Sequence, residues 1–252
     1  MLTAFTCNAQ SVQVLKDGKL IAEFYERDGW EFVFKEKEQD PADPYNGHEY
    51  VDLGLPSGLK WATMNVGATK PEEYGDYFAW GETEPYYTEG HSQDNPCSNW
   101  KDGKREYNPG DSYFDPGFSK YAKDIKTQLE LDNDAAHVNW GGDWRMPTKE
   151  EQDELLTNCS WEWTTSDGVN GYVVTGKNGK SIFIPAAGYR AGAALYDAGV
   201  RGVFWSSSLD TGNLNSSGKY GNAHNLDFVS SRVGNYKYDP RHYGESVRPV
   251  CP

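Results

Sequence analysis

The chain is 252 residues long and carries 38 acidic against 24 basic side chains, a formal net charge of -14. This charge would repel phosphate backbones and anionic lipid, which argues against nucleic acid and membrane surfaces as partners. No apolar run approaches the ~20 residues that a membrane span needs, so no transmembrane segment is expected. Nine Trp, 17 Tyr and 10 Phe stand beside 27 Gly and 13 Pro, a mixture typical of short strands and loops packed on aromatic rings.

Residues 1–9 are interpreted as the remnant of a signal peptide. Cys7 and Ala9 are small residues placed as in a signal-peptidase site before Gln10, although the basic segment is missing and the apolar part is short. The alternative is an ordinary frayed start. The first interpretation predicts export, to the cell surface or the extracellular space, with a periplasm-facing location as the alternative.

Residues 10–35 predict a small β unit of three strands. Asp17-Gly18 is the strongest short hairpin signal in this stretch, and a second turn precedes the aromatic run 30–34. The charged, proline-bearing stretch 36–46 is interpreted as a linker.

Residues 47–252 predict a larger domain of short antiparallel strands with one or two short helices. Thr148 and Glu151 have the spacing of a capping box, so a helix is expected to begin at about Lys149. Residues 84–120 form a long irregular loop. Strand-like runs cover 51–55, 59–62, 171–175, 181–185, 203–207, 223–229 and 246–250, with an Asn-Gly hairpin after the third. The fold class is therefore α+β.

Six motifs in this domain resemble one family. They are YVDLGLPSGLKWATMNVGA, YGDYFAWGE, WGGDWRMPTKEE, FIPAAGYR, FWSSS and GESVRPVC. Together they resemble, over residues 47–252, the Fibrobacter succinogenes major paralogous domain, a set of exported proteins of Bacteroidetes and related bacteria that is similar to the DUF1566 group. The resemblance implies a C-type lectin-like fold, in which small twisted antiparallel sheets carry short helices and long loops. It implies no activity, because the family has no well-defined one.

The same fold also carries formylglycine-generating enzymes, but an enzyme is the least favoured of the functions considered. The five histidines are scattered, and neither a zinc-binding pattern nor a nucleophile or phosphate-binding motif occurs. No catalytic residue and no metal ligand is therefore assigned. Cys159 and Cys251 are better explained as a structural disulfide than as a reactive pair, and Cys97 is left single if Cys7 is removed.

No cofactor is expected, with calcium as the one alternative. Asp94, Asn95 and the acidic positions of 108–117 offer oxygen ligands. A turn-rich solvated loop is the favoured interpretation, because the spacing matches no EF-hand loop.

The ligand site is expected around the strand at 223–229. Residues 206–246 are rich in Ser, Gly, Asn and Tyr, a mixture similar to that of antibody binding loops, although a variable surface loop has the same composition. The tryptophans are instead assigned to the core. The residues expected to contact ligand are Tyr220, Tyr236, Tyr238, Asp239, Arg241, His242 and Tyr243.

These observations predict an exported binding or adhesion module of the cell surface. The expected partner is a host or dietary glycan or a surface protein. The alternative is a structural accessory part of a surface assembly, such as a pilus tip or spacer, which binds no small ligand.

Overall fold

The computed structural model describes residues 2–6, 11–16, 19–25, 43–85, 126–191, 194–212, 221–234, 238–241 and 243–252. The chain divides into two compact units, Met1–Asp43 and Pro44–Pro252, and the division falls within the stretch interpreted as a linker. No helix in the described ranges is long and apolar enough to cross a membrane.

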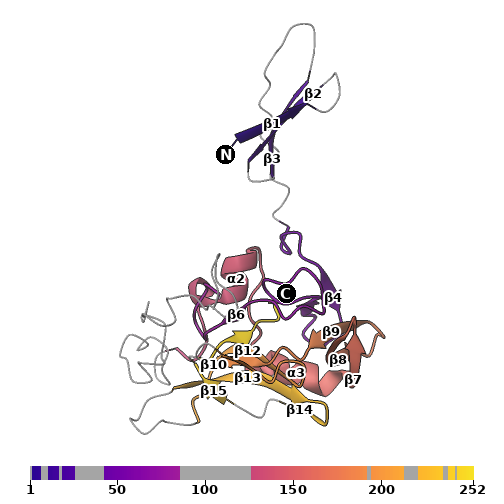
Figure 1. Ribbon diagram of the computed structural model, residues 1–252, viewed down its shortest axis with the longest axis vertical. Helices are drawn as coiled ribbons and strands as arrows, with labels where there is room; N and C mark the ends of the chain where they lie inside the picture. The colour runs from indigo at the N-terminus through magenta and orange to yellow at the C-terminus, as the bar shows by residue number, and fades with distance from the viewer. Residues whose placement is uncertain are drawn as a thin grey trace. The chain divides into compact units, whose positions relative to one another are not determined.

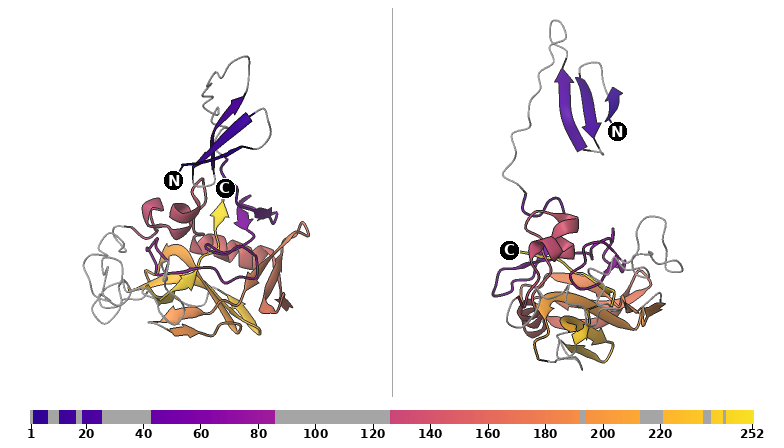
Figure 2. Two further views of the ribbon diagram at one scale, coloured as in Figure 1. Left: turned by 45° about the horizontal axis from the view of Figure 1, so that its top comes forward. Right: turned by 90° about the vertical axis from the view of Figure 1, so that its left-hand side faces the viewer.

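The first unit is a three-stranded antiparallel sheet in the order β1-β2-β3 (Figure 2). Its strands are β1 (Leu2–Thr6), β2 (Ser11–Lys16) and β3 (Lys19–Tyr25). Lys16 pairs with Lys19, so the hairpin lies where Asp17-Gly18 predicted it. The third strand differs from the prediction. Residues 2–6, interpreted as a signal remnant, pair with β2, whereas the run 30–34 lies outside the described residues.

The second unit is built around a six-stranded sheet with the order β14-β13-β12-β16-β6, in which β15 also pairs with β13 (Figure 1). Only the β12–β16 pair is parallel among the pairings of this sheet. Its strands are β6 (Tyr77–Phe78), β12 (Arg201–Leu209), β13 (Asn222–Val229), β14 (Arg232–Gly234), β15 (Tyr238–Pro240) and β16 (Glu245–Ser246).

Three smaller antiparallel sheets complete the unit, in the orders β17-β5-β4, β7-β8-β9 and β10-β11. Their strands are β4 (Tyr50–Asp52), β5 (Lys60–Ala62), β7 (Ser160–Ser166), β8 (Val169–Thr175), β9 (Ser181–Pro185), β10 (Tyr189–Ala191), β11 (Ala194–Tyr196) and β17 (Val250–Cys251). The described part of the chain is therefore sheet-rich α+β, with few helices.

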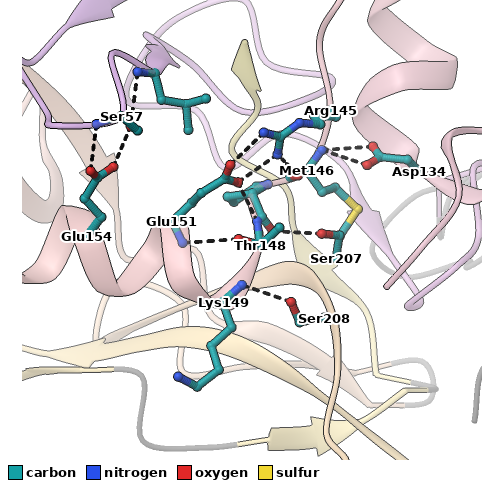
Figure 3. Close-up of polar contacts among 12 residues, drawn as sticks. Ser57, Asp134, Arg145, Met146, Thr148, Lys149, Glu151, Glu154, Ser207 and Ser208 are labelled. Carbon is teal, nitrogen blue, oxygen red and sulfur yellow. Dashed lines mark hydrogen bonds and ion pairs between the residues drawn. The ribbon is translucent and has the colours of Figure 1, made fainter. Parts of the chain in front are cut away.

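The expected helix is α3 (Lys149–Asn158), and its capping box is confirmed. Thr148 Oγ1 accepts from Glu151 N at 3.2 Å, and Glu151 Oε2 accepts from Thr148 N at 2.8 Å (Figure 3). The two terminal nitrogens of Arg145 bond both oxygens of Glu151, at 2.7 and 2.6 Å. The WGGDWR loop is therefore attached to the first turn of α3 by a bidentate ion pair.

The described residues also form η2 (Leu131–Asn133) and α2 (Ala135–Trp140), and Asp134 joins them. Asp134 is buried and is the N-cap of α2, where its Oδ1 accepts from the backbone N–H groups of Ala136 and His137 at 2.9 and 3.0 Å. Its two oxygens also accept from Met146 N at 3.0 and 2.8 Å (Figure 3). One carboxylate thus satisfies three backbone donors from two segments.

Replacing Asp134 with asparagine should therefore lower the free energy of unfolding by about 2 kcal/mol. The amide keeps one acceptor for α2 but places an N–H₂ group against the N–H of Met146. Urea denaturation of the full chain measures the change, and the exposed neighbour Asp132→Asn is the matched control. Equal midpoints for the two variants would contradict the role given to Asp134.

Two core clusters lie against the six-stranded sheet. The first core cluster is Ala62, Val66, Phe78, Trp80, Leu129, Ala135, Ala136, Trp140, Trp144, Met146, Trp205, Leu209, Ala223, Val247 and Cys251. The second core cluster is Leu53, Leu55, Leu59, Trp61, Leu155, Tyr172, Val174, Ile182, Ile184, Ala186, Ala187, Phe204, Leu226, Phe228 and Val250. Neighbouring residues of β12, Phe204 and Trp205, belong to different clusters, because successive side chains of a strand point to opposite faces.

The predicted core role of the tryptophans is confirmed for Trp140, Trp144 and Trp205, which are all buried. Trp140 and Trp144 meet edge to face, with ring centroids 5.1 Å apart. Trp161 and Trp163 are partly buried and pack against the second core cluster.

The structure corrects the expected disulfide, because Cys159 and Cys251 do not form one. Cys251 is a member of the first core cluster, whereas Cys159 packs against the second. Neither side chain lies in the cluster that holds the other, so the pairing that the sequence suggested is not formed.

Candidate ligand-binding site

The structure describes four of the seven residues expected to contact ligand. Tyr220, Tyr236 and His242 lie outside the described residues. The backbone of Tyr238 belongs to β15, where it pairs with His224 on β13. The remaining three are Asp239, Arg241 and Tyr243, and they have different environments.

Arg241 lies inside the fold, with 6% of its surface exposed. Its guanidinium carbon is 5.5 Å from the centroid of the Trp80 ring, and its carbonyl oxygen accepts from Trp80 N at 2.9 Å. Burial lowers the pKa of Arg241 to about 10. The side chain therefore packs against a core tryptophan, and it does not form the surface handle that the sequence suggested.

Tyr243 is the inner member of a row of three stacked rings, here called the tyrosine row (Tyr196, Tyr189 and Tyr243). The ring centroids of Tyr189 and Tyr243 are 5.5 Å apart, and those of Tyr189 and Tyr196 are also 5.5 Å apart, each pair inclined by 21°. Tyr189 and Tyr196 are direct partners across the β10–β11 pair, which places both rings on one face. Tyr243 packs against the first core cluster, while Tyr196 is 45% exposed. The row runs from the core to the surface.

Arg201 joins the tyrosine row to a buried carboxylate. Its guanidinium carbon is 5.2 Å from the centroid of the Tyr189 ring. Its Nε and Nη2 donate to the two oxygens of Asp227 at 2.9 and 3.0 Å, and Asp227 is fully buried. Burial lowers the pKa of Arg201, but the bonds to Asp227 outweigh it and raise that pKa overall. A bidentate pair of this kind fixes the plane of the guanidinium.

Asp239 lies beside this ion pair. Its Oδ2 lies 3.6 Å from Nη2 of Arg201, and its side chain is 14% exposed. The same oxygen accepts from Asn225 Nδ2 at 3.1 Å. Asp239 is therefore held on two sides and still reaches solvent, as expected of a polar group that meets a ligand.

Glu245 lies beneath Asp239 and is fully buried. Asn225 Nδ2 donates to its two oxygens at 3.1 and 3.2 Å. Burial raises the pKa of Glu245 well above the ordinary value, and the negative charge of Asp239 adds to the effect. Both effects disfavour the charged form of Glu245. Arg201, Asn225, Asp227, Asp239 and Glu245 are called the carboxylate network below.

A protonated carboxylic acid beside a second carboxylate is an arrangement that glycosidases use for acid–base chemistry. Here Glu245 is fully buried, so it has no contact with solvent. The carboxylate network instead fixes Arg201 and Asp239 beside the tyrosine row. Its geometry suits recognition by rigid groups.

Replacing Glu245 with glutamine should change how stability depends on pH. Because the folded-state pKa lies above the unfolded value, near 4.5, folding takes up a proton between these values. The wild-type protein should therefore lose stability, relative to the variant, as the pH rises above about 4.5. Urea midpoints of both proteins between about pH 4 and pH 8 measure this difference. Other titrating groups are common to both proteins, so parallel curves would contradict the prediction.

Sequence reasoning missed Tyr189, Tyr196 and Arg201, because their neighbours come from distant strands. One signal was present in the sequence. Asp227 interrupts an apolar run in β13, and a charge at such a position requires a buried partner. Arg201 is opposite Val229, so it lies diagonally across from Asp227 on the same face.

In the parts of the chain that the structure describes, no group of three or more His, Cys, Asp or Glu side chains is placed to hold a metal ion. The residues of the calcium alternative, Asp94, Asn95 and 108–117, lie outside those parts. No family model, no curated protein and no solved structure matches the chain.

Proposed function

We propose that the second unit is an exported binding or adhesion module of C-type lectin-like fold. Its ligand, a glycan or a surface protein, would contact the tyrosine row together with Arg201 and Asp239. The observation that carries the proposal is the contact between the partly exposed tyrosine row and the carboxylate network, which Arg201 makes.

The energetics of the site support recognition over simple packing. Burying Asp227 and Glu245 costs free energy, and their hydrogen bonds offset only part of that cost. A surface that needed only to be covered would use apolar residues at these positions. Rigid tyrosines are typical of binding surfaces, because they give a large contact area at a low cost in entropy.

The sheet-rich α+β architecture is compatible with the C-type lectin-like fold that the family resemblance implies. In this proposal Asp239 and Tyr243 keep the role expected of them. Tyr220, Tyr236, Tyr238 and His242 remain proposed contacts on the sequence argument alone. Arg241 is left out, since it packs on Trp80.

Binding by the full chain to cultured host cells and to immobilised glycans tests the proposal. Tyr196→Ala and Tyr189→Ala should each weaken binding about 10-fold. Tyr50→Ala is the matched control, because Tyr50 is 40% exposed and lies on β4. Thermal melting of each variant separates recognition from stability. A lower melting temperature with unchanged binding would refute the site and favour the structural accessory alternative.

A further inference from the structure

The exposed end of the tyrosine row provides a flat surface for an apolar ring face. Tyr189 covers part of one side of the Tyr196 ring, and solvent reaches 45% of that residue. Val200, which is 62% exposed, follows four residues later. These are two of the five large apolar side chains that are exposed in the described part of the chain.

The turn between Tyr196 and Arg201 is rigid. The carbonyl oxygen of Asp197 accepts from Val200 N at 3.0 Å and from Arg201 N at 2.9 Å, and Gly199 N donates to Ala186 O at 2.7 Å. Asp197 has a φ of 56°, in the left-handed region, and its side chain is exposed. A carboxylate is therefore held immediately after the exposed ring, on a fixed backbone.

The charges beside the tyrosine row favour hydroxyl groups over anions. Asp197 and Asp239 both add negative charge next to the ring of Tyr189. Arg201 is already bonded to Asp227 and lies 3.6 Å from Asp239, so its positive charge is balanced within the fold. A sugar acid would meet repulsion from these carboxylates, whereas a hydroxyl group can donate a short, charge-assisted hydrogen bond to them.

We infer that this site binds an uncharged glycan, with one sugar ring lying against Tyr196 and its hydroxyl groups donating to Asp197 and Asp239. A sugar ring has a face of C–H groups that can pack on an aromatic ring, and hydroxyl groups at its edge that need acceptors. The exposed ring and Asp197 lie in one short turn, and Asp239 on β15 lies 3.6 Å from Arg201, which ends that turn. This inference rests on the function proposed above.

The test uses the full chain on an array that contains uncharged, acidic and basic oligosaccharides. The strongest binder of each class is then titrated calorimetrically. We expect binding by uncharged oligosaccharides, and an affinity that changes less than about 2-fold between about 0.05 and 0.5 M NaCl, because no ion pair forms. Binding confined to the acidic or to the basic class, or no binding on the array, would overturn the inference.

Substitutions of Tyr196 and Asp197 test whether the sugar binds at this site. Tyr196→Ala should weaken binding about 10-fold, whereas Tyr196→Phe, which keeps the ring, should change it less than about 3-fold. Asp197→Asn should weaken it about 5-fold, and asparagine tolerates the left-handed backbone at this position. Tyr50→Ala should have no effect. Unchanged affinity of Tyr196→Ala for the uncharged oligosaccharide would overturn the inference.

The cell-binding assay separates this inference from the proposed function. If Tyr196→Ala loses cell binding while no uncharged oligosaccharide binds, the site is a binding site for a protein, and only the ligand class is wrong. If neither cells nor glycans depend on Tyr196, both the inference and the proposed function fail.

Discussion

Replacing Arg248 with methionine should lower the free energy of unfolding by about 4 kcal/mol. The guanidinium is buried and donates to Asn65 Oδ1 at 2.8 Å, to Ala62 O at 3.0 Å and to Phe183 O at 3.1 Å. Methionine fills a similar volume but leaves three buried acceptors without these donors. Burial lowers the pKa of Arg248 to about 9, which shows how far this site is from water.

Guanidinium denaturation of the full chain measures the loss. Arg232→Met is the matched control, because the side chain of Arg232 is 44% exposed and its ion pair with Asp227 spans 3.5 Å, so a change below about 1 kcal/mol is expected. Arg248→Lys should recover little stability, since an ammonium cannot reach three separate acceptors in the plane of a guanidinium. Equal losses for the Arg248 and Arg232 methionine variants would contradict this account.

Replacing Trp205 with alanine should cost about 4 kcal/mol, since it opens a cavity in the first core cluster. Trp205 and Trp80 are both fully buried. Trp205 Nε1 donates to Phe78 O at 2.8 Å, and Trp80 Nε1 donates to Ser206 O at 2.8 Å. Each indole therefore bonds the backbone beside the other, and the cavity variant also leaves a carbonyl group without its donor.

A double-mutant cycle checks this reciprocal bonding. Trp205→Phe and Trp80→Phe remove one N–H each and keep most of the ring, so each should cost about 2 kcal/mol. The double variant should lose less unfolding free energy than the sum of the two single losses. Both rings lie in the first core cluster, so the same rearrangement of neighbouring side chains can compensate for either change. Strict additivity would show that the two tryptophans act independently.

Local features of the fold could be predicted from the sequence because they depend on neighbouring residues. The capping box at Thr148 and the Asp17-Gly18 hairpin are found as expected. Each is specified by a few side chains that meet their own backbone. The strand at 2–6 was not predicted, although its alternation of Leu, Thr and Phe suits a sheet edge, because the same residues also suit a signal peptide.

The candidate site was only partly predictable, because its contacts join distant segments. Composition identified the region around β13, and two of its residues, Asp239 and Tyr243, lie in the site. Tyr189 meets Tyr243, and Arg201 meets Asp227, through contacts between segments that no local pattern joins. Arg241 was misjudged for the same reason, since its partner Trp80 is far away in sequence. The predicted cysteine pair is wrong because residue type alone does not show which core cluster a side chain packs against.

The pairing of β16 with β6, and of β17 with β5, has a consequence for how the second unit is made. Val250 pairs with Trp61, and Glu245 pairs with Phe78. Strands β5 and β6 therefore cannot pair until residues roughly 170 to 190 positions later in the chain have been synthesised. Closing such long loops makes folding slow, and a nascent chain exposes its aromatic segments until residue 251 has emerged. The two sheets that contain these pairs therefore cannot be completed until the last strands have been synthesised. A chaperone that binds the unfolded chain, or transport before folding, would act on this incompletely folded state, which lasts longer because the paired strands are far apart in sequence.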